Sequence, residues 1–237
     1  MNASGLDALK QALRDLADDA VAQQSRRFFK TGKGEYGEGD KFLGIRVPEL
    51  RKRVKQYPDI STQEIATLLT SEFHEERQLA LFLLVDLFQR SGTEDKAKIY
   101  ALYLNNTKYI NSWDLVDCSA EHIVGAYLHD RDRKPLYKLA CSKDLWERRI
   151  AILSTFYFIK RHEFDDALRV SEMLLNDEED LIHKAVGWML REIGKRELNT
   201  EEAFLRRHYR KMPRTMLRYA IEKFPEKKRQ AYLKGTL

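Results

Sequence analysis

Cysteines and long apolar runs are both scarce in this chain of 237 residues, and their scarcity excludes several classes of protein. The two cysteines, Cys118 and Cys141, have no metal-ligand partner at a useful spacing and form no disulfide framework, so they read as small buried residues. The longest apolar stretch, LALFLLV at 79–85, is too short to span a bilayer, and the N-terminus lacks a signal-peptide core. We therefore expect a cytoplasmic protein that does not associate with a membrane and uses no metal or cofactor.

Positive charge is in modest excess and is unevenly distributed. The net charge is +5 and the sequence pI is about 9.0. Between residues 191 and 237 there are 14 Lys and Arg against 6 Asp and Glu. Such an excess suits a polyanionic partner, although a solvated helix surface would explain it equally well.

A repeat of about 35 residues runs through most of the chain. Five amphipathic segments, at 75–88, 112–128, 146–159, 182–195 and 213–224, carry an apolar residue at the same helical phase. The steps between these markers are 35, 36, 34 and 35 residues. Two helices fill such a period in helical solenoids, where neighbouring repeats stack to bury their apolar faces. The markers are Ala80, Leu115, Ala151, Ala185 and Ala220.

Helix signals surround one glycine-rich segment and point to an all-α fold in a single domain, 1–237. A helix broken at most once is expected over 6–30, and the five glycines of 30–52 exclude regular helix there. Further helix starts are marked by proline or by a capping side chain. These starts are Pro48 for 48–56, Ser61 with Glu64 for 62–70, Thr93 for 94–104, Asp132 for 133–141, and Pro213.

Helical phase also selects a column of candidate binding residues, two positions before each marker. None of them is aliphatic, which favours a concave surface over a core position. Asp117 lies four residues after a member of this column, so the two side chains share one helix face. The column consists of Gln78, Trp113, Arg149, His183 and Arg218.

Each candidate also has a plain structural explanation. Trp113 could be a core residue beside a surface aspartate, and Arg149 could form a solvated pair with its neighbour Arg148. His183 could be an ordinary surface histidine, and Trp188 a core tryptophan. No metal site, Ser/His/Asp set or Cys/His pair emerges, so a carboxylate beside aromatic and basic residues is the one candidate active site.

Several blocks resemble the AlkD-like DNA alkylation repair glycosylases. They occur in the family's order, from about residue 25 to 225, and the WDxVD and GWxLRE patterns are the more specific ones. Two features depart from the family: Ser112 replaces a further tryptophan, and 30–41 is longer and richer in glycine. The blocks are FLGIRVPELRK, NSWDLVD, WERRIAIL and HKAVGWMLREIGK.

The resemblance implies a right-handed α-α superhelix of HEAT/armadillo-like repeats that binds duplex DNA containing alkylated bases. By position in the blocks, the catalytic aspartate falls on Asp117, the groove tryptophans on Trp113 and Trp188, and the DNA-contacting arginine on Arg149. His183, Lys184 and Arg218 complete the expected DNA-binding set. The implied activity is release of 3-methyladenine and 7-methylguanine by a monomeric enzyme.

A sparse site suits this reaction. A purine alkylated at N3 or N7 is already cationic and leaves without protonation, so an anion near the oxocarbenium-like sugar suffices. Two other functions stay open: a HEAT-like scaffold that binds DNA or protein without catalysis, and a silent relative that recognises branched or bent DNA.

Overall fold

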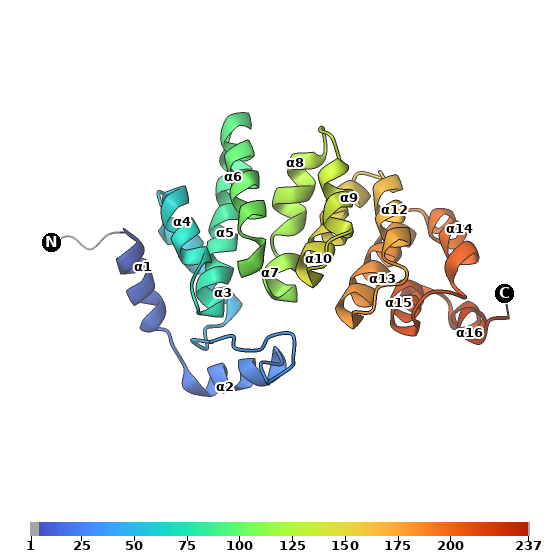
Figure 1. The fold of residues 1–237 in the computed structure, drawn as a ribbon, viewed down its shortest axis with the longest axis horizontal. Helices are drawn as coiled ribbons and strands as arrows, with labels where there is room; N and C mark the ends of the chain where they lie inside the picture. Colours follow the sequence, from blue (N-terminus) through green and yellow to red (C-terminus); the bar gives the residue numbers. More distant parts are fainter. Residues whose placement is uncertain (1–4, 237) are drawn as a thin grey trace. The chain divides into compact units, whose positions relative to one another are not determined.

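The computed structural model describes residues 5–236, and every regular element in that range is helical (Figure 1). The only β pairing there is an isolated bridge between Lys41 and Phe73. The expected all-α, helical-repeat fold is confirmed. No helix of the described residues has the length and apolar character needed to cross a membrane.

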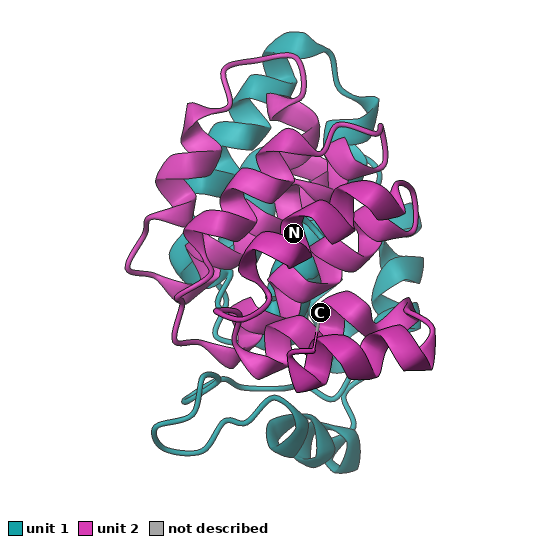
Figure 2. Cartoon of the chain, turned by 90° about the vertical axis from the view of Figure 1, so that its right-hand side faces the viewer, with its two compact units in different colours: residues 1–119 teal, residues 120–237 magenta. Residues whose placement is uncertain are grey.

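The chain divides into two compact units, residues 1–119 and residues 120–237 (Figure 2). The assignment of 1–237 to a single domain stays a prediction. Each unit has its own buried apolar core. The helices of the first unit are α1 (Gly5–Arg14), α2 (Asp19–Phe28), α3 (Val47–Gln56), α4 (Thr62–Leu69), α5 (His74–Arg90), α6 (Thr93–Asn105), the 3-10 turn η1 (Thr107–Tyr109) and α7 (Trp113–Asp117).

Helix α5 is the centre of the first unit. It packs against α3, α4, α6 and α7, and its residues from His74 to Leu84 are all buried. Helix α4 begins at the expected capping box, in which the Ser61 hydroxyl accepts from the Glu64 backbone and the Glu64 carboxylate accepts from the Ser61 backbone. This reciprocal cap satisfies two backbone donors at the helix start.

The second unit is built around α13. This helix packs against α10, α12, α14 and α15, and α10 packs in turn against α9. The elements are the π-helical turn η2 (Glu121–Gly125), α8 (Ala126–Leu128), α9 (Lys134–Ala140), α10 (Leu145–Ser154), α11 (Phe156–Ile159), α12 (Asp165–Met173), α13 (Asp180–Gly194), α14 (Leu198–His208), α15 (Arg214–Ala220), the 3-10 turn η3 (Ile221–Lys223) and α16 (Glu226–Lys234).

The repeat markers are the most accurate part of the sequence reading. All five have no exposed surface, as expected of residues that bury the inner face of each repeat. The amphipathic segments are less continuous than the pattern suggested. The segment 112–128 is split into α7, η2 and α8, and α10 ends at Ser154 before α11 begins at Phe156.

Three local expectations are wrong. Thr93 is the first residue of α6, whose N-cap is Gly92. Asp132 does accept from the Lys134 backbone, but the N-cap of α9 is Arg133. Cys141 is exposed because it follows the last residue of α9, and Cys118 is only half-buried. Pro213, by contrast, stands at the N-cap of α15 as expected of a helix start.

The close approach of α13 and α15 depends on a glycine. A Cβ added at Gly187 would lie 2.4 Å from the Met216 carbonyl oxygen and 2.5 Å from the Tyr219 Cβ. Replacing Gly187 with alanine is therefore expected to lower the free energy of unfolding by about 1–3 kcal/mol through overpacking, measured by urea denaturation. Gly92→Ala is the matched control, because a Cβ there meets nothing within 4 Å. Equal stability of the two variants would contradict this packing argument.

Candidate active site and nucleic-acid interface

The five-residue helix α7 carries both Trp113 and Asp117. Its inner face is formed by Leu115 and Val116, which have no exposed surface. Trp113 and Asp117 are half-buried, so each side chain keeps part of its surface accessible. Both expected residues therefore lie on one short helix, each with accessible surface.

Aromatic rings and a tyrosine hydroxyl hold Trp113 on its other sides. Its ring stacks on Phe29 with 5.7 Å between centroids and meets Phe28 edge-on at 5.9 Å. The Trp113 indole N–H donates to the Tyr36 hydroxyl across 3.3 Å. Because Tyr36 belongs to the glycine-rich segment 30–44, this segment contacts the proposed site directly. Phe28 leaves 63% of its surface exposed beside the indole.

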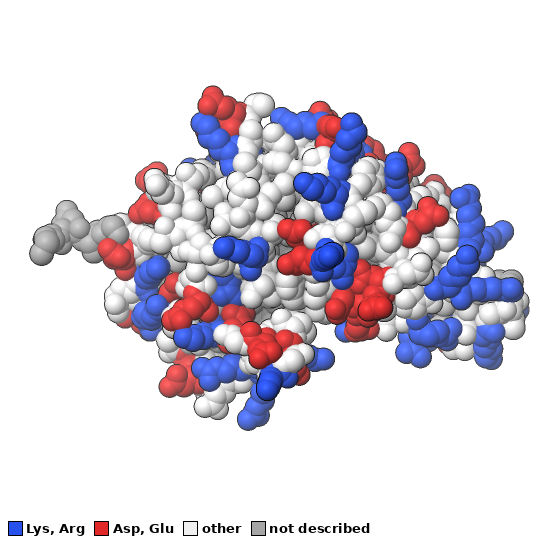
Figure 3. All heavy atoms as spheres, in the orientation of Figure 1, with Lys and Arg blue, Asp and Glu red and all other residues white. Residues whose placement is uncertain are grey.

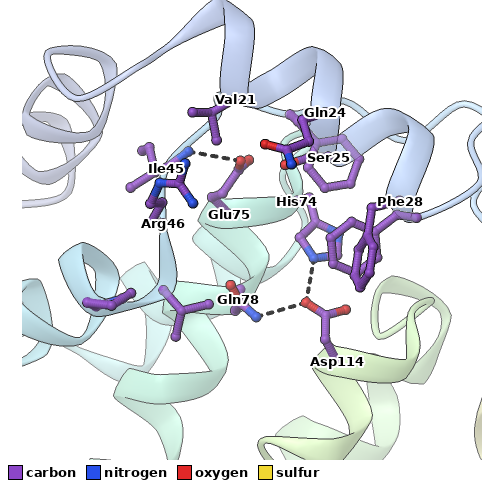
Figure 4. A pocket seen from close by; sticks show the side chains of 14 residues that line it. Val21, Gln24, Ser25, Phe28, Ile45, Arg46, His74, Glu75, Gln78 and Asp114 are labelled. Atoms are coloured by element: carbon purple, nitrogen blue, oxygen red, sulfur yellow. Dashed lines mark hydrogen bonds and ion pairs between the residues drawn. The ribbon is translucent and has the colours of Figure 1, made fainter.

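A buried histidine connects the glycine-rich segment to α7. His74, the first residue of α5, has Nδ1 2.8 Å from Asp40 Oδ2 and Nε2 2.8 Å from Asp114 Oδ2. Gln78, one turn further along α5, donates its amide to the same Asp114 oxygen across 2.8 Å. Arg77 donates to the other oxygen of Asp40 across 2.7 Å. Figure 4 shows His74 and Gln78 converging on Asp114.

The pKa values of this network follow from burial and paired charge. Burial opposes a charge on His74, but the charges and hydrogen bonds of Asp114 and Asp40 outweigh it and raise the pKa of His74 to about 9. Burial also opposes the charge on Asp40, yet the hydrogen bond from His74 and the charge of Arg77 keep the pKa of Asp40 below its ordinary value. Both groups are therefore charged at neutral pH.

Glu75 anchors the end of the glycine-rich segment. Its carboxylate is 3% exposed and accepts three backbone N–H groups, from Leu43 at 2.9 Å, Gly44 at 2.8 Å and Ile45 at 3.2 Å. Gly44 has a φ of +83°, and a Cβ there would lie 2.0 Å from the Asp18 carbonyl oxygen. The chain can approach α2 this closely only with glycine at position 44.

A cleft of about 470 Å³ opens beside this network (Figure 4). Apolar side chains, among them Phe28 and Phe42, form part of its lining. His74, Gln78 and Asp114 contribute polar surface. The cleft therefore combines aromatic walls with a polar region next to the helix that carries Trp113 and Asp117.

In the second unit, Trp188 and Lys184 lie one turn apart on α13. The Trp188 ring is half-buried, lies 5.8 Å from the Phe156 ring, and donates its N–H to Glu192 across 3.3 Å. Lys184 pairs with Asp180 at 2.7 Å, and this hydrogen bond lowers the pKa of Asp180. His183 is half-buried, and its Nε2 meets the backbone carbonyl of Asp177.

The interpretation of the phase column as an exposed surface is wrong for two of its members. Gln78 is 5% exposed and Arg149 is 4% exposed. The Arg149 guanidinium donates to the backbone carbonyl of Leu181. Both residues are buried because neighbouring helices cover the side of the helix from which they project. Arg218, the last member of the column, is exposed on α15.

The expected basic end is present on the surface. Figure 3 shows Lys and Arg side chains gathered over α14, α15 and α16. The exposed basic residues there are Arg206, Arg207, Arg210, Lys211, Arg214, Arg218, Lys223, Lys227 and Lys234. A surface of this charge is suited to phosphate groups.

Sequence reasoning missed the residues that support α7. Tyr36, Asp40, His74 and Asp114 lie far apart along the chain, and no periodic pattern links them. The one available signal was Asp114, which stands between the predicted Trp113 and Asp117 on the same helix.

Comparisons with known proteins agree with the fold and with the family that the sequence resembles. Residues 9–224 match the sequence profile of the family described as DNA alkylation repair enzyme. Curated protein sequences gave no match. Among solved structures, a predicted DNA alkylation repair enzyme from Enterococcus faecalis is similar at a TM-score of 0.68 and 17% identity, covering 89% of this chain and 97% of that one. AlkD2 from Streptococcus mutans is similar at a TM-score of 0.56 and 17% identity, covering 87% and 97%.

Proposed function

Because the chain belongs to the DNA alkylation repair enzyme family, we propose that it is a DNA glycosylase that hydrolyses the N-glycosidic bond of cationic alkylated purines. Its substrates in this proposal are 3-methyladenine and 7-methylguanine in duplex DNA. The observation that carries the proposal is the placement of Trp113 and Asp117 four residues apart on α7, both with accessible surface. A cytoplasmic location and a monomeric state stay predictions.

Asp117 is the catalytic residue in this proposal. When the bond between sugar and base breaks, positive charge develops on the sugar, and a nearby carboxylate lowers the energy of that state. The same carboxylate can orient the attacking water. The leaving purine already carries a positive charge, so no acid is needed to protonate it.

Trp113 and Trp188 would each pack against the sugar–phosphate backbone of the DNA and present an indole face to cationic bases. An indole ring presents an electron-rich face, which attracts a cationic base more than a neutral one. The supports of Trp113 from Phe29 and Tyr36 fix its ring orientation without covering it completely. A pre-positioned ring loses less conformational freedom on binding than a mobile one.

Basic side chains of the second unit would bind phosphates and set the register on the duplex without reading sequence. Arg218 is exposed and His183 and Lys184 are half-buried, so their side chains are accessible. Arg149 keeps its place in the proposed set. A phosphate contact from Arg149 requires its side chain, which is 4% exposed, to become more accessible.

Base release from damaged duplex DNA tests the proposed activity. Methylated duplex DNA is expected to yield free 7-methylguanine, whereas duplexes that contain uracil or hypoxanthine are expected to yield no free base. Neutral bases are poorer leaving groups, and this site supplies no acid for them. If no methylated base is released while DNA still binds, the scaffold or the silent relative becomes the better description.

The phosphate-binding role of Arg218 has its own test. Arg218→Ala is expected to weaken duplex binding and to reduce the slope of log K against log salt concentration by about 0.9, measured by fluorescence anisotropy. Lys98→Ala is the control, because the Lys98 ammonium is already paired with Glu94 and Asp95. An unchanged slope would remove Arg218 from the phosphate-binding set.

A further inference from the structure

We propose that His74 is a positioning residue that ties the glycine-rich segment 30–44 to α7 and so fixes the orientation of Trp113 and Asp117. This inference rests on the proposed function only for its effect on base release. The bridge, which runs from Asp40 through His74 to Asp114, lies within the first unit and can be tested without measuring any activity.

The geometry requires a doubly protonated imidazole. Both ring nitrogens of His74 lie 2.8 Å from carboxylate oxygens, one of Asp40 and one of Asp114. An ionised carboxylate only accepts hydrogen bonds, so each nitrogen must carry a hydrogen for both bonds to form. Neutral histidine has one N–H and can keep only one of the two bonds.

Burial makes the loss of either bond costly. His74 is 2% exposed, and the side chains of Asp40 and Asp114 are 5% and 12% exposed. Phe42 at 4.7 Å and Phe29 at 4.8 Å flank the imidazole ring, so water has little access to it. A carboxylate that faced an unprotonated ring nitrogen here would lose one of its two side-chain donors in a low-dielectric surrounding, and would keep only Gln78 in the case of Asp114 or Arg77 in the case of Asp40.

The surrounding charges also favour the positively charged form of His74. Asp40 and Asp114 each contribute a negative charge, and Arg77 supplies a single positive charge against Asp40. Glu75, next along α5, adds a negative charge that the three backbone N–H groups of 43–45 already satisfy. The exposed Arg46 lines the same cleft. Burial opposes a charge on His74, but the charge and hydrogen bond of Asp114, followed by those of Asp40, raise the pKa of His74 to about 9.

The bridge is important because α7 is too short to be stable without contacts from other elements. A helix of five residues has one turn of internal hydrogen bonds and depends on tertiary contacts for its orientation. Asp114 sits in that turn, directly after Trp113 and three residues before Asp117. At the other end of the bridge, Asp40 belongs to the segment whose Tyr36 accepts the indole N–H of Trp113. Loss of the bridge would therefore weaken the connection between α7 and the segment that supplies the acceptor for Trp113.

The wild-type protein tests this inference through its pH dependence. Stabilisation by the bridge is present in full below the ordinary histidine pKa of 6.5 and is lost as pH rises through about 9. We expect the NMR signal of the Trp113 indole N–H to change with a midpoint near pH 9. The single-turnover rate of base release is expected to fall over the same range, with an enzyme-free control at each pH. An indole signal that stays constant between pH 7 and 9.5 would overturn the inference.

Two variants separate positioning from general stability. His74→Gln is expected to slow base release by roughly tenfold or more, as a misplaced catalytic group does, and to remove the alkaline fall in rate. Affinity for duplex DNA should fall by less than the rate does, because the exposed basic side chains proposed to bind phosphates are unchanged. Tyr36→Phe removes the hydroxyl that accepts the Trp113 indole N–H and keeps His74, so it should give a smaller loss of rate while keeping the alkaline fall.

Glu72→Gln is the matched control, because it breaks an exposed ion pair with Lys41 beside the same segment and leaves the bridge intact. A folded His74→Gln protein that keeps the wild-type rate, or that keeps the alkaline fall, contradicts the inference. If His74→Gln does not fold, the wild-type indole titration decides alone. If the wild type releases no base, the proposed function fails, and the same titration still decides whether the bridge orients Trp113.

Discussion

Replacing Asp117 with asparagine is expected to slow base release by about 100- to 1,000-fold while duplex DNA binds as tightly as before or more tightly. A carboxylate about 4 Å from the developing positive charge, at an effective dielectric constant near 20, contributes on the order of 4 kcal/mol, or nearly three decades in rate. Asparagine keeps the size of the side chain and loses the charge. The same change removes repulsion between the carboxylate and the DNA backbone.

The rate and the affinity are measured separately for this variant. Single-turnover kinetics with excess protein report the chemical step, and anisotropy reports binding to undamaged duplex. Asp95→Asn provides the control, because it removes a charge of the same kind from an exposed position on α6. A variant of Asp117 that lost affinity and rate in parallel would place this residue in binding, not in catalysis.

Replacing Glu75 with alanine is expected to give the largest loss of stability among single substitutions in the first unit. The change leaves the backbone N–H groups of Leu43, Gly44 and Ile45 without their acceptor. Each buried donor that loses its partner costs about 1–3 kcal/mol, so a loss of at least 3 kcal/mol in the free energy of unfolding is expected. Urea denaturation measures it.

Glu72→Ala is the comparison for this prediction. The Glu72 carboxylate is 59% exposed and pairs with a single lysine, so its removal should cost about 1 kcal/mol or less. Glu72 lies just before α5 and Glu75 lies in its first turn, and both contact the glycine-rich segment. The two variants therefore differ mainly in how deeply the lost carboxylate was buried. A Glu75→Ala protein as stable as the Glu72→Ala protein would show that the segment does not depend on this anchor.

The repeat could be read from the sequence because it depends on local periodicity. Apolar residues at one helical phase must be buried wherever such helices stack, and Ala80, Leu115, Ala151, Ala185 and Ala220 all have no exposed surface. The start of α4 was accessible for the same reason, since Ser61 and Glu64 interact within a single turn. Features that depend on residues within one helix can be predicted without knowing the tertiary structure.

The phase column shows where that reasoning ends. Phase gives the direction of a side chain from its own helix axis, and it does not say which neighbouring element covers that direction. Trp113 and Arg218 keep accessible surface, whereas Gln78 and Arg149 are buried. The contacts of His74 could not be predicted for a related reason, because Asp40 and Asp114 lie 34 and 40 residues away from it in the sequence.

In the proposed function the charge of Asp117 drives the release of cationic purines, and this role is tested by comparing two proteins side by side. Wild type and Asp117→Asn are incubated with methylated duplex DNA at protein concentrations that saturate both, and free 7-methylguanine is quantified by mass spectrometry against an enzyme-free sample. We expect release by the wild type, with an equal number of abasic sites, and release by the variant at least about 100-fold slower. Equal rates for the two proteins, or no release by the wild type, would contradict it.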